Sequence, residues 1–144
     1  TYGSVADQRK YILNARADKS QTFWVVSGAE DTSPVGVVRW THLDDSERMG
    51  WESLIVVPIA PPAVGIDVMV TTYNYCFRVL GRPLLGPWRV PYENVRMQAA
   101  HARMGFAKIV DDQPATGMLW YAVTEEWFHD VWPKWSARGY GKIN

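Results

Sequence analysis

The chain of 144 residues has the length of one globular domain, and its 47% hydrophobic and 21% charged residues are typical of such a domain. Fifteen basic and fifteen acidic residues cancel, which excludes an overall field that would recruit nucleic acid or an anionic membrane. A single cysteine excludes an internal disulfide and a multi-cysteine metal site, and the three dispersed histidines lack zinc-like spacing. We therefore expect a cytoplasmic protein without a bound metal.

The first part of the chain predicts one helix and a set of strands. Ser4 followed by an acid three residues later is typical of a helix N-cap, and apolar spacing carries this helix to about residue 15. β-branched and aromatic residues predict three strands, at 22–27, 35–41 and 51–57. A polar turn at 28–34 joins the first two. The third strand is an almost unbroken apolar run, which predicts a central strand covered on both faces.

The second part alternates helices with strands. The proline-rich stretch 58–65 is expected to be a loop, because proline cannot donate to a strand ladder. Apolar residues at helical spacing then predict an amphipathic helix from Ile66 to Leu80, which ends at Gly81. The remaining expected elements are an irregular strand at 85–92, a helix capped by Asn94, strands at 106–110 and 117–123, and a short helix that ends near residue 134.

This order of elements predicts an α/β (α+β) fold with a mixed, mostly antiparallel sheet and helices on both faces. We expect one domain over residues 1–134 and a polar C-terminal tail over residues 135–144. The longest apolar run is far too short to span a membrane, and residues 1–10 contain no apolar stretch of the kind found in signal peptides.

Four segments carry motifs that can be compared with a known family. They are the strand pair with Trp24-Val-Val and Pro34-Val-Gly-Val-Val, the helical Tyr75-Cys-Phe-Arg-Val-Leu-Gly, the run from Asn94 to Gly105-Phe106, and Trp120-Tyr-Ala-Val-Thr-Glu-Glu-Trp. In this order they resemble the GCN5-related N-acetyltransferase (GNAT) superfamily, above all its branch that modifies ribosomal-protein N-termini and amino sugars. The resemblance covers about residues 22–128. It implies an acyl-CoA-dependent N-acyltransferase that acts on a small amine, an amino sugar or a peptide N-terminus.

The resemblance also implies a site for acetyl-CoA. In the family, a loop of the form Q/R-x-x-G-x-G/A binds the diphosphate through backbone amides at a helix N-terminus. The aligned residues here are 62–67, in which Pro62 replaces the basic residue, Gly65 is retained and Asp67 replaces the last small residue. A carboxylate against a diphosphate is repulsive, so we expect impaired use of acetyl-CoA; Asp67 also suits the N-terminus of its own helix. The expected cofactor-binding residues are Leu54, Ile55, Val56, Val57, Val64, Gly65, Ile66, Asp67 and Asn94.

Two residues are the candidates for catalysis. His101 aligns with the family's donor to the departing thiolate, and Glu52 lies near the place where some members hold a general base. The residues alone also allow simpler interpretations. His101 then packs on a helix between Met97 and Met104, Glu52 is a solvated acid at a strand entrance, and Asn94 is only an N-cap.

A second functional interpretation stays open beside the enzyme. The family's first strand and helix have no counterpart in this chain, and the cofactor loop is altered. The alternative prediction is therefore a degenerate, non-catalytic module that binds a ligand or partner. The expected partners are a small-molecule or peptide amine and, because an incomplete sheet edge and eight tryptophans favour pairing, a second copy in a homodimer.

Overall fold

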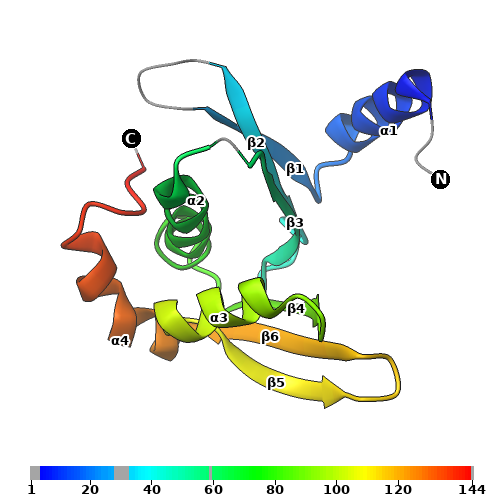
Figure 1. Cartoon of the computed structure of the whole chain (residues 1–144). Coiled ribbons are helices and arrows are strands. Elements are labelled where there is room, and N and C mark those ends of the chain that lie inside the picture. The colour runs from blue at the N-terminus through cyan, green and yellow to red at the C-terminus, as the bar shows by residue number, and fades with distance from the viewer. Residues whose placement is uncertain (1–3, 28–32, 59, 144) are drawn as a thin grey trace.

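The computed structural model describes residues 4–27, 33–58 and 60–143 and shows an α+β fold (Figure 1). One three-stranded antiparallel sheet has the order β1-β2-β3, with β1 at Thr22–Ser27, β2 at Pro34–Thr41 and β3 at Gly50–Val56. The other has the order β4-β6-β5, with β4 at Leu84–Pro91, β5 at Lys108–Gln113 and β6 at Met118–Thr124. The helices are α1 (Val5–Ala17), α2 (Pro62–Asn74), the π-helix η1 (Tyr75–Val79), α3 (Val95–Met104) and α4 (Glu125–Ser136). The predicted fold class is confirmed.

The two sheets meet at a single point and then diverge. The Met49 N–H donates to the Leu84 carbonyl (3.0 Å), and the Gly86 N–H donates to the Met49 carbonyl (2.8 Å). Beyond this parallel bridge between Met49 and Leu85, no strand pairing joins β3 to β4 within the described residues. The facing edges of β3 and β4 are therefore left without a strand partner.

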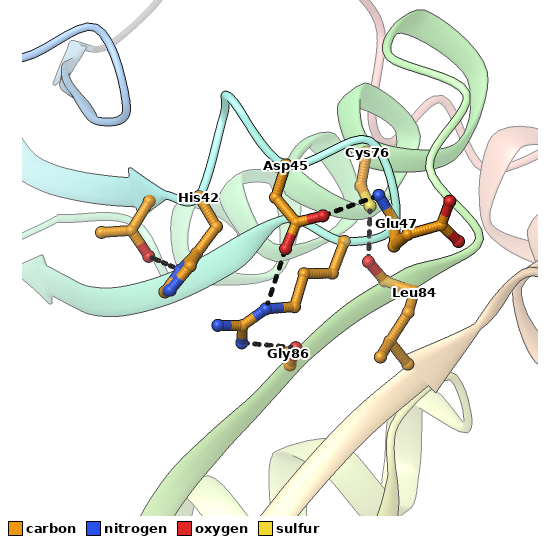
Figure 2. Close-up of polar contacts among 8 residues, drawn as sticks. His42, Asp45, Glu47, Cys76, Leu84 and Gly86 are labelled. Atoms are coloured by element: carbon orange, nitrogen blue, oxygen red, sulfur yellow. Dashed lines mark hydrogen bonds and ion pairs between the residues drawn. The ribbon is translucent and has the colours of Figure 1, made fainter.

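The loop between β2 and β3 holds this junction in place (Figure 2). Asp45 accepts a hydrogen bond from the Glu47 N–H (2.8 Å) and pairs with the Arg48 guanidinium (3.5 Å). Arg48 also donates to the Gly86 carbonyl at 3.5 Å, a weak bond by its length. The same loop thus fixes the start of β3 against the start of β4.

Helix α2 begins four residues before the predicted start, so the prediction of a loop through residue 65 is wrong. Proline is tolerated at the first helical position, where its missing N–H would have had no partner in any case. Pro62 occupies that position. The preceding Pro61 provides no side-chain cap, and the helix passes at its other end into η1, where the Leu80 N–H donates to the Tyr75 carbonyl.

The strand predictions hold in outline and differ in detail. β3 is not covered on both faces, because Ile55 is 65% exposed and the strand forms an edge of its sheet. β5 lies at Lys108–Gln113, later than the predicted 106–110, and Val110 forms a bulge in its pairing with β6. The predicted turn at 28–34 falls almost wholly outside the described residues.

Aromatic side chains fill the core between the helices and the two sheets. Fully or almost fully buried rings come from strands and helices alike: Trp40, Trp51, Tyr73, Phe77, Trp88, Phe106, Tyr121, Phe128 and Trp135. They form contacts such as the stacking of Phe77 on Phe128 at 4.9 Å between centroids. Trp24, by contrast, is 48% exposed, so not every strand tryptophan belongs to the core.

The C-terminal residues pack onto the domain. Trp135 is buried and its indole N–H donates to the Met104 carbonyl (2.9 Å), inside a helix that continues to Ser136. Residues 137–143, the C-terminal strap, then reach α2. There the Gly141 N–H donates to the Asp67 carboxylate (2.8 Å), and Asn74 donates to the Gly141 carbonyl (2.7 Å). The strap is therefore an ordered part of the fold, in contrast to the polar tail expected from residue 135.

Candidate functional site

A cleft of about 430 Å³ lies between the diverging edges of β3 and β4. This volume is within the range of small-molecule sites. The cleft is lined by residues of β3, β4, α3, β6 and the turn before α3: Trp51, Glu52, Ser53, Leu54, Pro87, Trp88, Arg89, Val90, Pro91, Asn94, Met97 and Trp120. Two free strand edges offer backbone donors and acceptors to whatever binds there.

A β-bulge shapes the β3 wall. Arg39 of β2 pairs with Ser53 and Trp40 pairs with Trp51, so Glu52 is an extra residue between them. A bulge of this kind bends the strand and re-aims side chains. Trp51 consequently points into the core, whereas Glu52 is exposed and lines the cleft.

A second bulge shapes the β4 wall. Leu85 pairs with Val123 and Trp88 with Tyr121, which leaves two residues of β4 opposite one of β6. Gly86 has φ of +101°, and a Cβ at this position would lie 2.8 Å from the ring of Trp88. Only glycine fits both the conformation and the space at position 86, and the absence of a Cβ there lets the Trp88 ring pack against the Gly86 backbone.

His101 lies behind this wall. Its ring is 1% exposed and contacts the rings of Trp51, Trp88 and Tyr121. The Trp88 indole N–H donates to His101 Nε2 (3.3 Å), so the proton of the neutral imidazole is on Nδ1, which has no partner among the described residues. Burial lowers the pKa of His101 to about 4, and the ring is therefore neutral at physiological pH.

The N-terminal end of α2, the expected diphosphate site, has no side chain that caps it. A Cβ added to Gly65 would meet nothing within 4 Å, so this turn of the helix has open space beside it. Asp67 lies in the second turn and not in the first, and its carboxylate accepts the Gly141 N–H. The expectation that Asp67 lies at the N-terminus of its own helix is therefore wrong; the carboxylate accepts a hydrogen bond from the C-terminal strap.

Comparisons with known proteins give matches in structure alone. No family model matches the chain, and no curated protein sequence matches it. The structure of apo FdhC, a nucleotide-linked sugar GNAT, superposes with a TM-score of 0.80 at 17% identity, over 93% of this chain and 75% of that one. Spermidine N-acetyltransferase from Vibrio cholerae, in complex with CoA and spermine, gives 0.75 at 12% identity, over 89% and 79% of the two chains. The chain has the GNAT fold.

Within this GNAT fold, the structure brings some of the predicted site residues together and separates others. Glu52, Leu54 and Asn94 line the same cleft, although the Asn94 side chain also caps α3 by accepting the Met97 N–H (3.1 Å). His101 does not line the cleft and lies behind Trp51 and Trp88, which do. Residues 64–67 lie in the first two turns of α2, outside the cleft lining, and Ile55 and Val57 are exposed.

Sequence reasoning missed Trp88 and Arg89 in the cleft. Two prolines marked 85–92 as an irregular strand, and this hid its alternation: Trp88 and Val90 are buried while Arg89 is exposed. Arg89, a charged residue between two apolar ones on a predicted strand, was the available signal.

Other reactive groups do not contribute to this site. Cys76 is buried with its sulfur near the Leu84 carbonyl (3.6 Å; Figure 2), and burial raises the pKa of the thiol to about 12, so it is unreactive. Within the described ranges, no group of three or more His, Cys, Asp or Glu side chains could hold a metal ion, and no helix is long and apolar enough to cross a membrane.

Proposed function

We propose that the protein is an acyl-CoA-dependent N-acyltransferase whose acceptor is a small amine, an amino sugar or a peptide N-terminus. The observation that carries the proposal is the cleft between two unpaired strand edges in a GNAT fold. CoA is present in the structure of the spermidine N-acetyltransferase, and FdhC is a nucleotide-linked sugar GNAT; both support this class of reaction.

The strand edge and the helix would share the binding of acyl-CoA. The free edge of β3 from Leu54 to Val56 offers N–H and C=O groups to the two amides of a pantetheine arm, in the manner of an added strand. The N-terminus of α2 has no side-chain cap and offers its positive dipole end to a diphosphate, although Pro62 has no N–H and the Val64 N–H donates to the Pro61 carbonyl (3.0 Å). The space at Gly65 allows a close approach.

The chemistry follows from the groups on the two walls. The neutral amine attacks the thioester carbonyl carbon, and Glu52 takes the amine proton directly or through a water. The C–S bond breaks to release a thiolate, which takes a proton from solvent, and Glu52 returns its proton to solvent. His101 was predicted to donate to this departing thiolate. In its neutral state the ring can give a hydrogen bond from Nδ1–H, whereas transfer of that proton would need a much stronger acid than a neutral imidazole.

A non-catalytic binding module is the second candidate. It is favoured by the position of His101 behind Trp88, and by Pro62, which brings neither a positive charge nor a backbone N–H to the start of α2. Such a module would use the cleft for a ligand and transfer nothing.

Gly65→Ala tests the acyl-CoA site with two readouts of opposite sign. Alanine in a helix is more stable than glycine by about 1 kcal/mol and no neighbour obstructs the methyl group, so the free energy of unfolding in urea is expected to rise by that amount. The methyl group occupies the space that the diphosphate needs, so calorimetric titration is expected to show CoA binding weakened roughly tenfold or more. The wild-type chain is the reference for both measurements.

The outcomes separate the candidates. CoA binding by the wild type together with acyl transfer supports the enzyme. No binding at millimolar CoA contradicts it and leaves the binding module. CoA binding that Gly65→Ala does not weaken contradicts the placement of the diphosphate at α2.

We further propose a cytoplasmic location, from the composition, and a homodimer. Exposed apolar side chains on the outer face of the β1–β3 sheet support pairing: Val25 is 63% and Ile55 is 65% exposed.

A further inference from the structure

One wall of the cleft carries a cation without a partner. Arg89 lies on β4 between the buried residues Trp88 and Val90, so its side chain leaves the strand on the face opposite to α3. Arg89 is exposed and lines the cleft. Among the described residues, no carboxylate lies within ion-pairing distance of the Arg89 guanidinium. No carbonyl of these residues accepts a hydrogen bond from Arg89 either. A fork of N–H donors is therefore free at the cleft.

The neighbouring strand adds a second free donor. Trp120 of β6 is the cross-strand partner of Arg89, so the two side chains lie on the same face of the sheet. Trp120 also lines the cleft, and its indole N–H is shielded from solvent with no hydrogen-bond acceptor among the described residues. A buried donor without a partner is rare in proteins and often marks a group that a ligand satisfies.

The carboxylates nearest to these donors lie on the opposite wall of the cleft or one strand away. Glu52 lies on the β3 wall of the same cleft and makes no ion pair in the described part of the chain. Asp111, the other cross-strand neighbour of Trp120, lies one strand further from Arg89, and its carboxylate accepts from Gln113 (2.7 Å). The β4–β6 wall thus offers one cation, Arg89, and one neutral donor, the Trp120 indole N–H, and the β3 wall offers the Glu52 carboxylate.

We infer that the acceptor of the proposed acyl transfer is an amine that also carries an anionic group, a carboxylate or a phosphate. The anion binds Arg89 and the Trp120 indole N–H, and the amino group is directed to Glu52. A polyamine has no anion for Arg89 and would be repelled by it. This inference rests on the proposed function, since it names the acceptor class of that same cleft.

The test uses simple anions and a spectroscopic reporter, so that it does not depend on catalysis. Indole N–H signals are recorded by NMR on the whole chain labelled with nitrogen-15, and Trp120→Phe assigns the Trp120 signal. Titration with inorganic phosphate and, separately, with acetate is expected to shift this signal to saturation with at least one of them. The anion that binds more tightly identifies phosphate or carboxylate as the preferred group.

Arg89→Gln and Arg103→Gln are the matched variants. Both remove one exposed arginine, but Arg103 lies on α3 outside the cleft. Arg89→Gln is expected to weaken anion binding at Trp120 roughly tenfold or more, as for the loss of a charge-assisted hydrogen bond. Arg103→Gln is expected to leave it unchanged. The inference is wrong if neither anion moves the Trp120 signal at millimolar concentration, or if both variants weaken binding equally.

A transfer assay separates this inference from the proposed function. Glucosamine 6-phosphate and glucosamine differ only in the anionic group, and the phosphorylated amine is expected to bind more tightly and to be acetylated faster. Equal binding of the two amines by a chain that does bind CoA overturns the inference and leaves the acyltransferase intact. A chain that binds the anions but not CoA keeps the anion site and contradicts the enzyme.

Discussion

Replacement of Gly141 by alanine is expected to lower the free energy of unfolding by about 2–5 kcal/mol, the sum of backbone strain and overpacking. Gly141 has φ of +73°, which costs any residue with a Cβ. The added Cβ would also lie 2.7 Å from Val70 Cγ1 and 3.0 Å from the Trp132 ring. The strap is clamped here by Asp67 and Asn74, so it cannot move aside without losing both hydrogen bonds.

Gly139 provides the matched control in the same segment. It also has a positive φ, +86°, but nothing lies within 4 Å of the Cβ it would gain. Gly139→Ala is therefore expected to cost only the backbone strain, about 1–2 kcal/mol. Urea unfolding of the wild type and both variants measures the difference. Equal losses in the two variants would show that the strap is not packed against α2 as described.

The second large effect is a loss of stability in weak acid that depends on His101. Burial lowers the pKa of this histidine from 6.5 to about 4. Between these values the unfolded chain binds a proton that the folded chain does not, so stability falls as the pH is lowered from about 6.5 towards about 4. The whole interval corresponds to about 3 kcal/mol, at 1.36 kcal/mol for each pH unit. Above pH 6.5 His101 contributes no pH dependence.

His101→Gln and His129→Gln separate this contribution from that of all other groups. His129 is an exposed histidine on α4, 3.6 Å from Glu125. The slope of unfolding free energy against pH is measured in urea between pH 7 and pH 4.5 for each variant. We expect a shallower slope for His101→Gln and an almost unchanged slope for His129→Gln. A slope that both variants share with the wild type would mean that His101 is accessible to protons in the folded state.

The sequence was a good guide to the elements because their signals are local. Ser4 and Asn94 both cap helices through their side chains, as their spacing predicted, and Gly105 ends α3 with φ of +82°. The start of α2 was missed because three prolines indicated a loop, although proline at the first helical position is compatible with a helix.

The site was only partly predictable, because its shape depends on which strands do not pair. The apolar run of β3 indicated a covered strand, and nothing local shows that β3 and β4 separate after Met49 and Leu85. Glu52 and Asn94 both line the cleft, and their catalytic and cofactor-binding roles stay predictions. The shielding of His101 depends on Trp88, which a bulge brings against it.

Long-range contacts explain the remaining differences. Asp67 was interpreted as a residue of the cofactor loop, but its partner is Gly141, 74 residues further along the chain. The helix spacing gives no information about such a partner. The same holds for Arg89 and Trp120, which become neighbours only through the pairing of β4 with β6.

The central claim is that the cleft between β3 and β4 binds acyl-CoA, and a crystal structure of the chain with saturating acetyl-CoA tests it most directly. The account predicts an extended pantetheine arm between the two strands, hydrogen-bonded to the backbone of Leu54–Val56, with the diphosphate at the N-terminus of α2 beside Gly65. Acetyl-CoA bound elsewhere on the molecule, or an empty cleft at millimolar acetyl-CoA, would contradict it.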